Sequence, residues 1–358
     1  MLKIGIPAEI MSGEGRVALT PDDCGQLVKV GCAVHLQSKA GLACGYADTA
    51  YTAVGVTIHK TAEQLYRAAE LIVKVKQPLA DDLKWLESRH LLFSFLHLAA
   101  DPVLIGQLAD IGLTAIPFEA VSNATGFPLL APMSAIAGRL SVLRGAGLLF
   151  STAGSGVLLG GVDGSEQGRV AVLGAGVAGG HAMAAAHALG AEVNVFDLNA
   201  DRLVALKQQW PEVHIHSATA DVIAEYCEQA DLVIGAVMLA GRRAPVVLKQ
   251  SSIARMRPGS VIVDIAIDQG GCVEGIHATS AESPVYSHLG VLHSAVPNMP
   301  GAVPRTAAQS LSTVIRPYVQ QLASESLDRL PALNSAVAIR AGQVVDPVLQ
   351  QALAGNAD

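Results

Sequence analysis

The stretch Arg169-Val-Ala-Val-Leu-Gly-Ala-Gly-Val-Ala-Gly-Gly180 begins as an apolar run and then breaks into glycines. Its first residues predict a buried parallel strand over 170–173, and the glycines predict a tight turn. The alanine-rich residues that follow predict a helix that runs through Met183 and Ala188. A strand, a glycine turn and a helix in this order are typical of a βαβ unit in an α/β protein.

The three glycines of this turn have the spacing of a dinucleotide-binding loop. Gly174 permits the turn, Gly176 lets backbone N–H groups approach a pyrophosphate, and Gly179 lets the helix pack close to its strand. Together with Val177 and Ala178, they would hold the phosphates at the positive end of the helix. Glycine-rich turns are common in α/β proteins, so a structural turn without a ligand is the alternative.

A second apolar run, 192–197, follows at one helix length and ends in an acid. Asp197 lies 18 residues after Gly179, at the tip of the second predicted strand. A carboxylate there can accept hydrogen bonds from the adenosine ribose hydroxyls, and it would repel a 2′-phosphate. The sequence therefore predicts NAD rather than NADP as the cofactor, although Arg202, five residues on, could soften that preference.

Composition bounds the class of protein. The chain has 358 residues, 51% of them hydrophobic and 15% charged, which predicts a compact protein of two domains. A net charge of −7 without a basic cluster argues against nucleic-acid binding. No apolar run is long enough to span a bilayer, and the sequence opens on a strand-like run without an export leader. Five scattered cysteines without a C-x-x-C motif fit reduced thiols, so we expect a cytoplasmic protein and no metal site.

Short apolar runs alternate with helical patterns along the whole chain. This alternation predicts an α/β fold of two doubly wound, Rossmann-like domains with a cleft between them, joined by long helices. We expect residues 1–129 and 305–358 to form a discontinuous substrate domain, with the tail packing back on the first part, and residues 130–304 to form the NAD-binding domain. The predicted strands are 3–6, 33–37, 56–59, 71–75, 91–96, 113–118, 170–173, 192–197, 213–216, 231–237, 260–267 and 291–296. The main predicted helices are 21–30, capped by Thr20, 62–69, 102–111, 132–150, and 305–322, kinked or ended at Pro317.

Two cationic candidates stand where an open α/β sheet binds its ligands, beyond the carboxyl ends of strands. Lys76 closes an apolar run and shares a face with Lys74 by strand alternation, so it could bind an anion. A pair of solvated lysines is the alternative. Arg16 lies in a glycine-containing loop after the first strand, where its guanidinium could bind a carboxylate. An ordinary surface arginine is the alternative there.

Two further candidates could transfer protons or stabilise charge. His97 ends another apolar run, and imidazole is the side chain best suited to proton transfer near neutral pH, although a lone histidine is commonly structural. Asp268 follows an apolar strand and precedes a Gly-Gly turn, where its carboxylate could stabilise a developing cation or orient a water. We interpret Asp264, within the same strand, as the more structural of the two acids.

Several sequence blocks spread over essentially the whole chain are specific to one family. The blocks are Gly5-Ile-Pro-Ala-Glu9, Glu14-Gly-Arg16-Val-Ala-Leu-Thr-Pro21, Lys74-Val-Lys-Gln-Pro78, Phe95-Leu-His-Leu-Ala-Ala100, Leu130-Ala-Pro-Met-Ser134, Asp264-Ile-Ala-Ile-Asp-Gln-Gly-Gly-Cys272 and Met299-Pro-Gly-Ala-Val-Pro-Arg-Thr306. With them the chain closely resembles the alanine dehydrogenase/pyridine nucleotide transhydrogenase family. The transhydrogenase branch is disfavoured, because its members carry Glu where this chain has Asp268.

The resemblance implies roles for named residues. Arg16 and Lys76 would hold the substrate carboxylate, and Asn298 would line the substrate end of the site. His97 would be the general acid and base, and Asp268 the acid that assists addition of water or ammonia. Glu119 would belong to the catalytic shell. The residues that would contact NAD are Ser134, Gly174, Gly176, Val177, Ala178, Gly179, Asp197, Val237 and Leu239.

The resemblance also implies a reaction, the reversible oxidation of L-alanine by NAD to pyruvate, ammonia and NADH. One alternative is a related amino-acid dehydrogenase of the same family with another side-chain preference. The other is a catalytically silent NAD-binding protein. The presence of all four polar candidates argues against it, namely Arg16, Lys76, His97 and Asp268. The family further implies a homo-oligomer, usually a hexamer, with small molecules as its only other partners.

Overall fold

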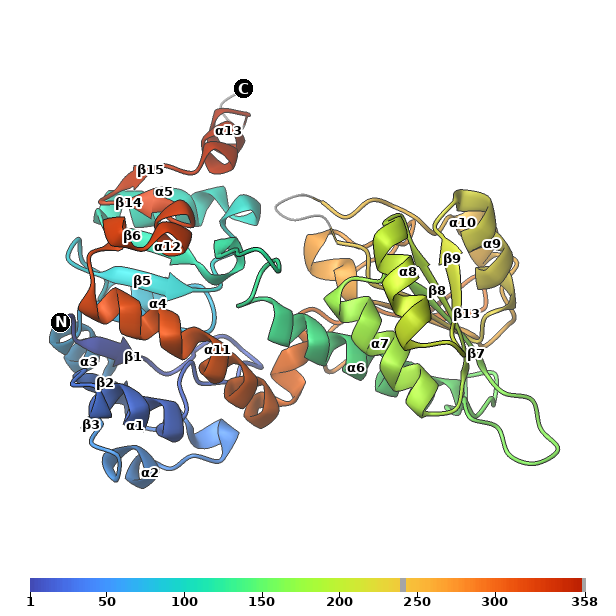
Figure 1. The fold of residues 1–358 in the computed structure, drawn as a ribbon, viewed down its shortest axis with the longest axis horizontal. Coiled ribbons are helices and arrows are strands. Elements are labelled where there is room, and N and C mark those ends of the chain that lie inside the picture. Colours follow the sequence, from blue (N-terminus) through green and yellow to red (C-terminus); the bar gives the residue numbers. More distant parts are fainter. Residues whose placement is uncertain (239–242, 356–358) are drawn as a thin grey trace. The chain divides into compact units, whose positions relative to one another are not determined.

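The computed structural model describes residues 1–238 and 243–355. The chain divides into two compact units, Met1–Met133 with Gly301–Asp358, and Ser134–Pro300 (Figure 1). Each unit is built on its own mainly parallel sheet with helices around it. The α/β class and the two Rossmann-like units are therefore confirmed. The limits 129/130 and 304/305 stay a prediction about where the domains divide.

An eight-stranded sheet organises the first unit, in the order β15-β14-β6-β5-β4-β1-β2-β3. The first six strands of the chain pair in parallel, and the last two add an antiparallel hairpin to β6. The strands are β1 (Ile4–Ile6), β2 (Val34–Gln37), β3 (Thr57–His59), β4 (Leu71–Val73), β5 (Leu91–Ser94), β6 (Thr114–Pro117), β14 (Ile339–Arg340) and β15 (Gln343–Val344).

The helices of the first unit connect these strands, and the C-terminal ones return to the same sheet. They are α1 (Pro21–Lys29), α2 (Asp48–Thr52), α3 (Ala62–Ala68), α4 (Ala80–Leu83), α5 (Pro102–Ile111), α11 (Pro304–Ser324), α12 (Pro331–Ser335) and α13 (Pro347–Gly355). Ile339 of β14 pairs with Ala115 of β6, so this part of the C-terminal segment lies against the first sheet. The two-stranded hairpin itself is missing from the sequence prediction, because strands of two residues leave no periodic pattern.

Two local predictions in this unit need correction. The predicted helix 305–322 forms as α11, but the alternative that it ends at Pro317 is wrong, because α11 continues to Ser324. Thr20 occupies the N-cap of α1, but its hydroxyl accepts from no backbone N–H of the helix and donates instead to the Asp23 carboxylate (3.2 Å). That carboxylate also accepts from Ser312 and from Arg316, so it ties α1 to α11 instead.

A seven-stranded sheet organises the second unit, in the order β12-β13-β11-β10-β7-β8-β9, with β12 alone antiparallel. The strands are β7 (Arg169–Leu173), β8 (Glu192–Asp197), β9 (His214–Ser217), β10 (Leu232–Gly235), β11 (Val261–Asp264), β12 (Tyr286–His288) and β13 (Val291–Ser294). The helices are α6 (Ala131–Leu149), which starts just before this unit, α7 (Val177–Ala188), α8 (Ala200–Gln209), α9 (Ala220–Gln229) and α10 (Gln250–Ile253).

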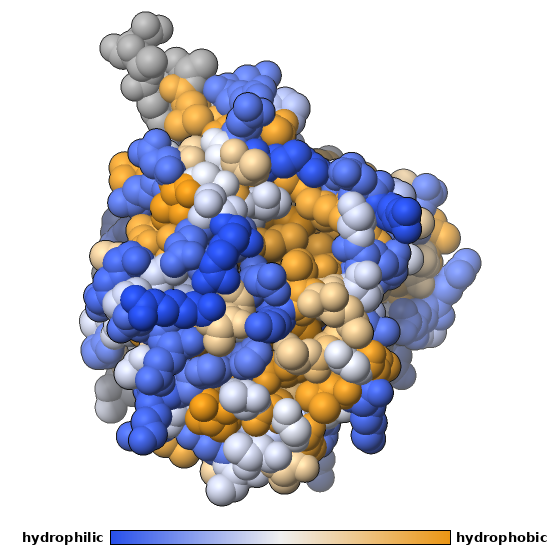
Figure 2. Space-filling model, turned by 90° about the vertical axis from the view of Figure 1, so that its left-hand side faces the viewer, coloured by the Kyte–Doolittle hydropathy of each residue, from blue (hydrophilic) through white to orange (hydrophobic). Residues whose placement is uncertain are grey.

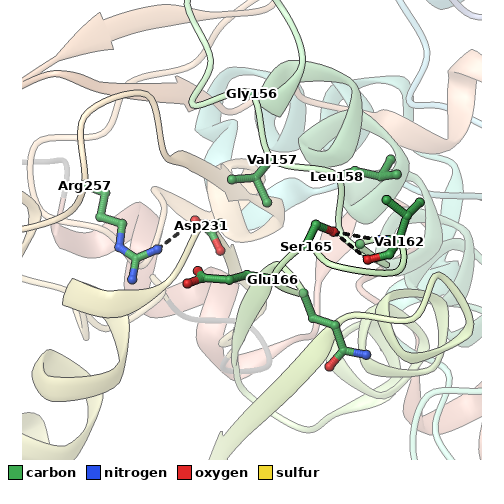
Figure 3. A pocket seen from close by; sticks show the side chains of 10 residues that line it. Gly156, Val157, Leu158, Val162, Ser165, Glu166, Asp231 and Arg257 are labelled. Carbon is green, nitrogen blue, oxygen red and sulfur yellow. Dashed lines mark hydrogen bonds and ion pairs between the residues drawn. The ribbon is translucent and has the colours of Figure 1, made fainter.

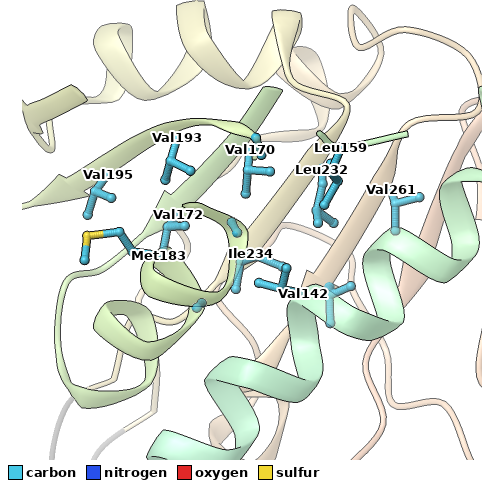
Figure 4. Packing of buried hydrophobic residues seen from close by; sticks show 14 of the residues in the cluster. Val142, Leu159, Val170, Val172, Met183, Val193, Val195, Leu232, Ile234 and Val261 are labelled. Carbon is cyan, nitrogen blue, oxygen red and sulfur yellow. The ribbon is translucent and has the colours of Figure 1, made fainter. Parts of the chain in front are cut away.

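One core of this unit lies where α6 and α7 cover one face of the sheet. Val142 of α6 and Met183 of α7 point toward Val172 and Ile234 of the central strands (Figure 4). All four side chains are at most 1% exposed. Small residues on α7 let it lie close to the strands, so the βαβ unit predicted from the glycine stretch forms as expected.

Gly179 is the point of closest approach between α7 and the turn. A Cβ added at Gly179 would lie 1.7 Å from the Gly174 carbonyl oxygen, whereas a Cβ at the next residue, Gly180, would meet no atom within 4 Å.

Gly179→Ala should therefore lower the free energy of unfolding by about 1–3 kcal/mol, because the helix must move off the turn to make room. Gly180→Ala is the matched control and should leave it unchanged or raise it by about 0.5–1 kcal/mol, since alanine favours the helix. Urea unfolding of both variants tests this. Equal effects of the two substitutions would contradict the packing argument.

Candidate functional site

The glycine turn connects β7 to α7 at the carboxyl edge of the second sheet. Gly174 adopts a left-handed φ of 97°, and an added Cβ there would lie 2.8 Å from the Ala236 carbonyl oxygen. Gly176 is the N-cap of α7, and a Cβ added to it would meet no atom within 4 Å. The open space beside Gly176 leaves room for a phosphate near the N-terminal end of the helix, next to Val177 and Ala178.

Asp197 ends β8 beside this turn. Its carboxylate accepts hydrogen bonds from Ala175 N (2.7 Å), Asn199 N (2.9 Å) and Arg202 Nη1 (3.0 Å). Burial would raise the pKa of Asp197, but these three donors outweigh it, and the pKa is lowered. The acid thus stays ionised near neutral pH, and Arg202, which could have softened the cofactor preference, is bound to it.

Three other predicted cofactor residues have different surroundings. Val237 follows β10, and its backbone N would lie 3.2 Å from a Cβ added at Gly174, so it adjoins the glycine turn. Ser134 is half-buried in the first turn of α6. Leu239 lies outside the described residues.

In the first unit, Arg16 binds a carboxylate of the chain itself. Glu14 accepts from Arg16 Nε (2.7 Å) and Nη2 (2.5 Å), and its Oε1 also accepts from the Arg16 backbone N–H (3.0 Å). Both side chains are at most 2% exposed. The Nη1 group lies 3.1 Å from the Met133 sulfur. This bidentate pair orients the guanidinium, and the alternative of an ordinary surface arginine is wrong.

Lys74 and Lys76 do not share a face, contrary to the alternation argument. Strand β4 ends at Val73, so strand periodicity does not extend over both lysines. Lys74 is buried between Glu9 (3.5 Å) and Asp82 (3.2 Å), whereas Lys76 is half-buried. The alternative of two solvated lysines is also wrong, and Lys76 is the lysine that reaches the surface of the unit.

His97 follows β5 in a strained backbone conformation. Its φ of 49° is left-handed, which is unusual for a residue with a side chain. Glu119 accepts from the backbone N–H groups of Leu96 (3.2 Å) and His97 (2.6 Å) and lies 4.0 Å from His97 Nδ1. The imidazole stacks on Phe95 with 11° between the ring planes and remains 45% exposed.

Asp268 lies on a short 3-10 helix, Ile265–Gln269, where a longer β11 was predicted. The strand stops at Asp264, because that buried carboxylate accepts from Ala266 N, Cys272 N and Val273 N and bends the chain. Burial raises the pKa of Asp264 to about 6, although these N–H groups oppose the rise. Asp264 is thus structural, as predicted, and it holds the segment that carries the exposed Asp268.

Asn298 lies next to Asp268. Its backbone N–H donates to Asp268 Oδ2 (3.5 Å), and its φ of 55° is left-handed. Among the described residues, five non-glycine residues have a positive φ, and two of them, His97 and Asn298, are predicted site residues. Such strain collects at functional sites, where the surrounding structure holds it in place.

The structure brings the predicted residues of each unit to one edge of its sheet. Arg16, Lys76 and His97 follow the neighbouring parallel strands β1, β4 and β5. Asp197, Gly174, Val237, Asp268 and Asn298 follow β8, β7, β10, β11 and β13, which are neighbours in this order. The carboxyl edge of an open parallel sheet is where such folds bind ligands.

Sequence reasoning missed two acids that position these residues, Glu9 and Glu14. The Glu14-x-Arg16 spacing could have indicated the pair, because it allows one carboxylate to bind both the backbone and the side chain of the arginine. Glu9 left no signal, since its partners Lys74 and Val75 lie more than 60 residues away in sequence.

A hollow of about 350 Å³ in the second unit lies elsewhere. It is lined by residues 156–158, 161, 162 and 165–167 together with Asp231 and Arg257, which form an ion pair at 3.6 Å (Figure 3). Asp231 and Gln167 come just before β10 and β7, so the hollow lies at the amino edge of the sheet, opposite the glycine turn. It is therefore not at the predicted dinucleotide loop.

Among the described residues, no helix combines the length and apolar character that a bilayer crossing requires.

Comparison with known proteins gives consistent matches over both units. Residues 5–137 match the family model "Alanine dehydrogenase/PNT, N-terminal domain", and residues 141–347 match the corresponding C-terminal domain. The alanine dehydrogenase of Bacillus subtilis is 42% identical over 346 residues, covering 95% of this chain and 90% of that protein. The alanine dehydrogenase of Mycobacterium tuberculosis is 41% identical over 340 residues, covering 94% and 92%.

Two solved structures extend the comparison. An L-alanine dehydrogenase structure superposes with a TM-score of 0.95 at 43% identity and covers 99% of both chains. A transhydrogenase from Sinorhizobium meliloti superposes with a TM-score of 0.83 at 25% identity, covering 96% of this chain and 99% of the other.

Glu119→Ala should lower the free energy of unfolding by about 1–3 kcal/mol, because Leu96 N–H and His97 N–H lose their acceptor. Glu87→Ala, which removes only a surface pair with Arg89, should leave it nearly unchanged. Urea unfolding of the two variants measures the difference. A Glu119 variant as stable as the Glu87 variant would show that the carboxylate does not hold this backbone.

Proposed function

Because the chain belongs to the alanine dehydrogenase/PNT family, we propose that it catalyses the reversible oxidative deamination of L-alanine to pyruvate and ammonia with NAD. The observation that carries this proposal is the similarity to alanine dehydrogenases along the whole chain, 42% identity over 95% of it for the Bacillus subtilis protein. The L-alanine dehydrogenase structure, which covers 99% of the chain, supports the same reaction.

The carboxyl edge of the second sheet suits a pyridine dinucleotide. The open space beside Gly176 at the start of α7 would take the pyrophosphate, and the ionised Asp197 would accept from the ribose hydroxyls. Ser134, Val237 and Leu239 would complete the contacts. NAD, when bound there, would supply the hydride acceptor that oxidation of the substrate α-carbon requires.

The residues of the first unit would bind the substrate. Arg16, held by Glu14, and Lys76 would bind its carboxylate, and two cations on one small anion orient the α-carbon for reaction. His97 would remove a proton from the attacking water and return one to the departing ammonia. Its exposed imidazole, with the backbone held by Glu119, supports that role.

The second unit would complete the reaction. Asp268 would offset positive charge on the substrate's iminium nitrogen, and Asn298, whose backbone N–H contacts that carboxylate, would line the substrate end.

The substrate is tested by NADH production at alkaline pH with L-alanine beside a panel of other amino acids. We expect L-alanine to give the highest kcat/KM. Activity on another amino acid without activity on alanine would point to a related dehydrogenase. No turnover of any amino acid, together with tight NADH binding, would point to a silent NAD-binding protein.

His97→Ala should lower kcat by about 100-fold or more, because a general acid and base contributes at least that factor. NADH binding, measured by nucleotide fluorescence, should remain within about two-fold of the unmodified protein, since the imidazole is not assigned to the cofactor. Unchanged turnover in this variant would refute the role of His97.

Asp197→Ala should raise the ratio of kcat/KM with NADP to kcat/KM with NAD by about 10-fold or more, a change of about 1.4 kcal/mol. The repulsion of the 2′-phosphate is lost, and Arg202 is released to bind it. Asp201→Ala serves as the control, because it removes an exposed acid from the first turn of α8, the helix that carries Arg202. It should leave the ratio unchanged. Equal ratios in all three proteins would contradict the role of Asp197 in cofactor choice.

A cytoplasmic homo-oligomer, a hexamer as in the family, completes the proposal. All five cysteines are free and buried, which supports a reducing compartment. Figure 2 shows apolar residues reaching the surface between polar ones on the face it presents, which supports contacts between subunits. Light scattering after size-exclusion chromatography would give the number of subunits.

A further inference from the structure

A buried cluster of charges lies directly behind Lys76, outside the residues assigned above. Lys74 lies between two carboxylates, Glu9 (3.5 Å from Nζ) and Asp82 (3.2 Å), and none of the three side chains is more than 4% exposed. A buried charge is costly unless it is paired and hydrogen-bonded, so such a cluster needs a reason.

The two acids of this cluster bind the backbone on either side of Lys76. Glu9 accepts from Val75 N (2.7 Å) and, at longer range, from Lys76 N (3.4 Å). Asp82 accepts from Leu79 N (3.1 Å) and from the Tyr66 hydroxyl (2.9 Å). The segment that carries Lys76 is therefore held at both ends by carboxylates that share one ammonium.

The same segment supports the neighbouring loop. Phe95 N donates to the Val75 carbonyl oxygen (3.1 Å), two residues before His97. Burial raises the pKa of Glu9, but the Lys74 ammonium and the Val75 N–H oppose the rise, so the lysine favours the ionised acid.

We propose that Glu9, Lys74 and Asp82 are positioning residues that hold residues 74–79 so that the Lys76 ammonium meets the substrate carboxylate. The inference rests on the proposed function, because it needs Lys76 to bind that carboxylate. It predicts that substitutions in the cluster weaken binding of the substrate carboxylate and leave binding of the cofactor unchanged.

Glu9→Gln is the main test variant, because it keeps the size of the side chain and one acceptor for Val75 N–H. Its NH2 group would then face Lys74 Nζ and the Lys76 N–H, both donors, so the bonds to these two groups are lost while the bond to Val75 N–H remains. Asp82→Asn disturbs the other end of the segment and serves as the second variant. Asp81→Asn, which removes only a surface pair with Lys84, is the matched control.

Both Glu9→Gln and Asp82→Asn should raise the KM for pyruvate by about 10-fold, with the KM for NADH within about two-fold. Asp81→Asn should change neither. In a Lys76→Met background, Glu9→Gln should cause no further rise in the KM for pyruvate, because residues that act through one another are not additive. A purely structural role would move both KM values or would add to the Lys76 effect.

Three results would overturn the inference. If the KM for pyruvate is unchanged in both Glu9→Gln and Asp82→Asn but raised in Lys76→Met, this inference is overturned and the proposed function is not. Fully additive effects in the double variant would do the same. No reduction of pyruvate by the unmodified protein with ammonia and NADH would overturn the proposed function, and this inference with it.

Discussion

Four carboxylates bind the backbone N–H groups of the segments that follow the parallel strands at their carboxyl ends. Glu9 binds the segment after β4, Glu119 that after β5, Asp197 the turn after β7 and Asp264 the bend after its own strand β11. A strand ladder ends abruptly, and the next N–H groups would otherwise lack an acceptor inside the protein. An ionised acceptor makes a stronger bond to them than a neutral one.

These acids explain why the segments at the sheet edges can carry function without being loose. His97 and Asn298 keep left-handed backbones, which cost energy and persist only where neighbouring bonds determine them. The Glu119 bonds to Leu96 N–H and His97 N–H, and the contact of Asn298 N–H with Asp268, are bonds of that kind. A backbone held at these points fixes where the His97 and Asn298 side chains start. A catalytic group must be held in this way to meet a substrate in the right geometry.

The two sheet edges divide the chemistry. The edge of the first sheet gathers cations and an imidazole, suited to a small acid and its protons. The edge of the second sheet offers a glycine turn and the ionised Asp197, suited to a dinucleotide. Acids differ in their partners at the two edges: Glu14 binds the Arg16 guanidinium and Glu9 binds the Lys74 ammonium, whereas Asp197 binds the backbone of the glycine turn and Arg202.

The sequence by itself determined the parallel strands and the glycine turn, since these depend on local periodicity and on glycines at single positions, whereas the order of the strands in each sheet came from the structure. Strand ends were predicted too far along at Val75, Leu96 and Ile267. Side chains distant in sequence, Glu9 and Glu119, bind the backbone after the first two strands, whereas Asp264 bends the chain at the end of its own strand. Only the tertiary structure separated Lys74 from Lys76. Two lysines two residues apart share a face in a strand, but β4 ends before both of them. Burial between Glu9 and Asp82 places Lys74 in the interior, whereas Lys76 is half-buried.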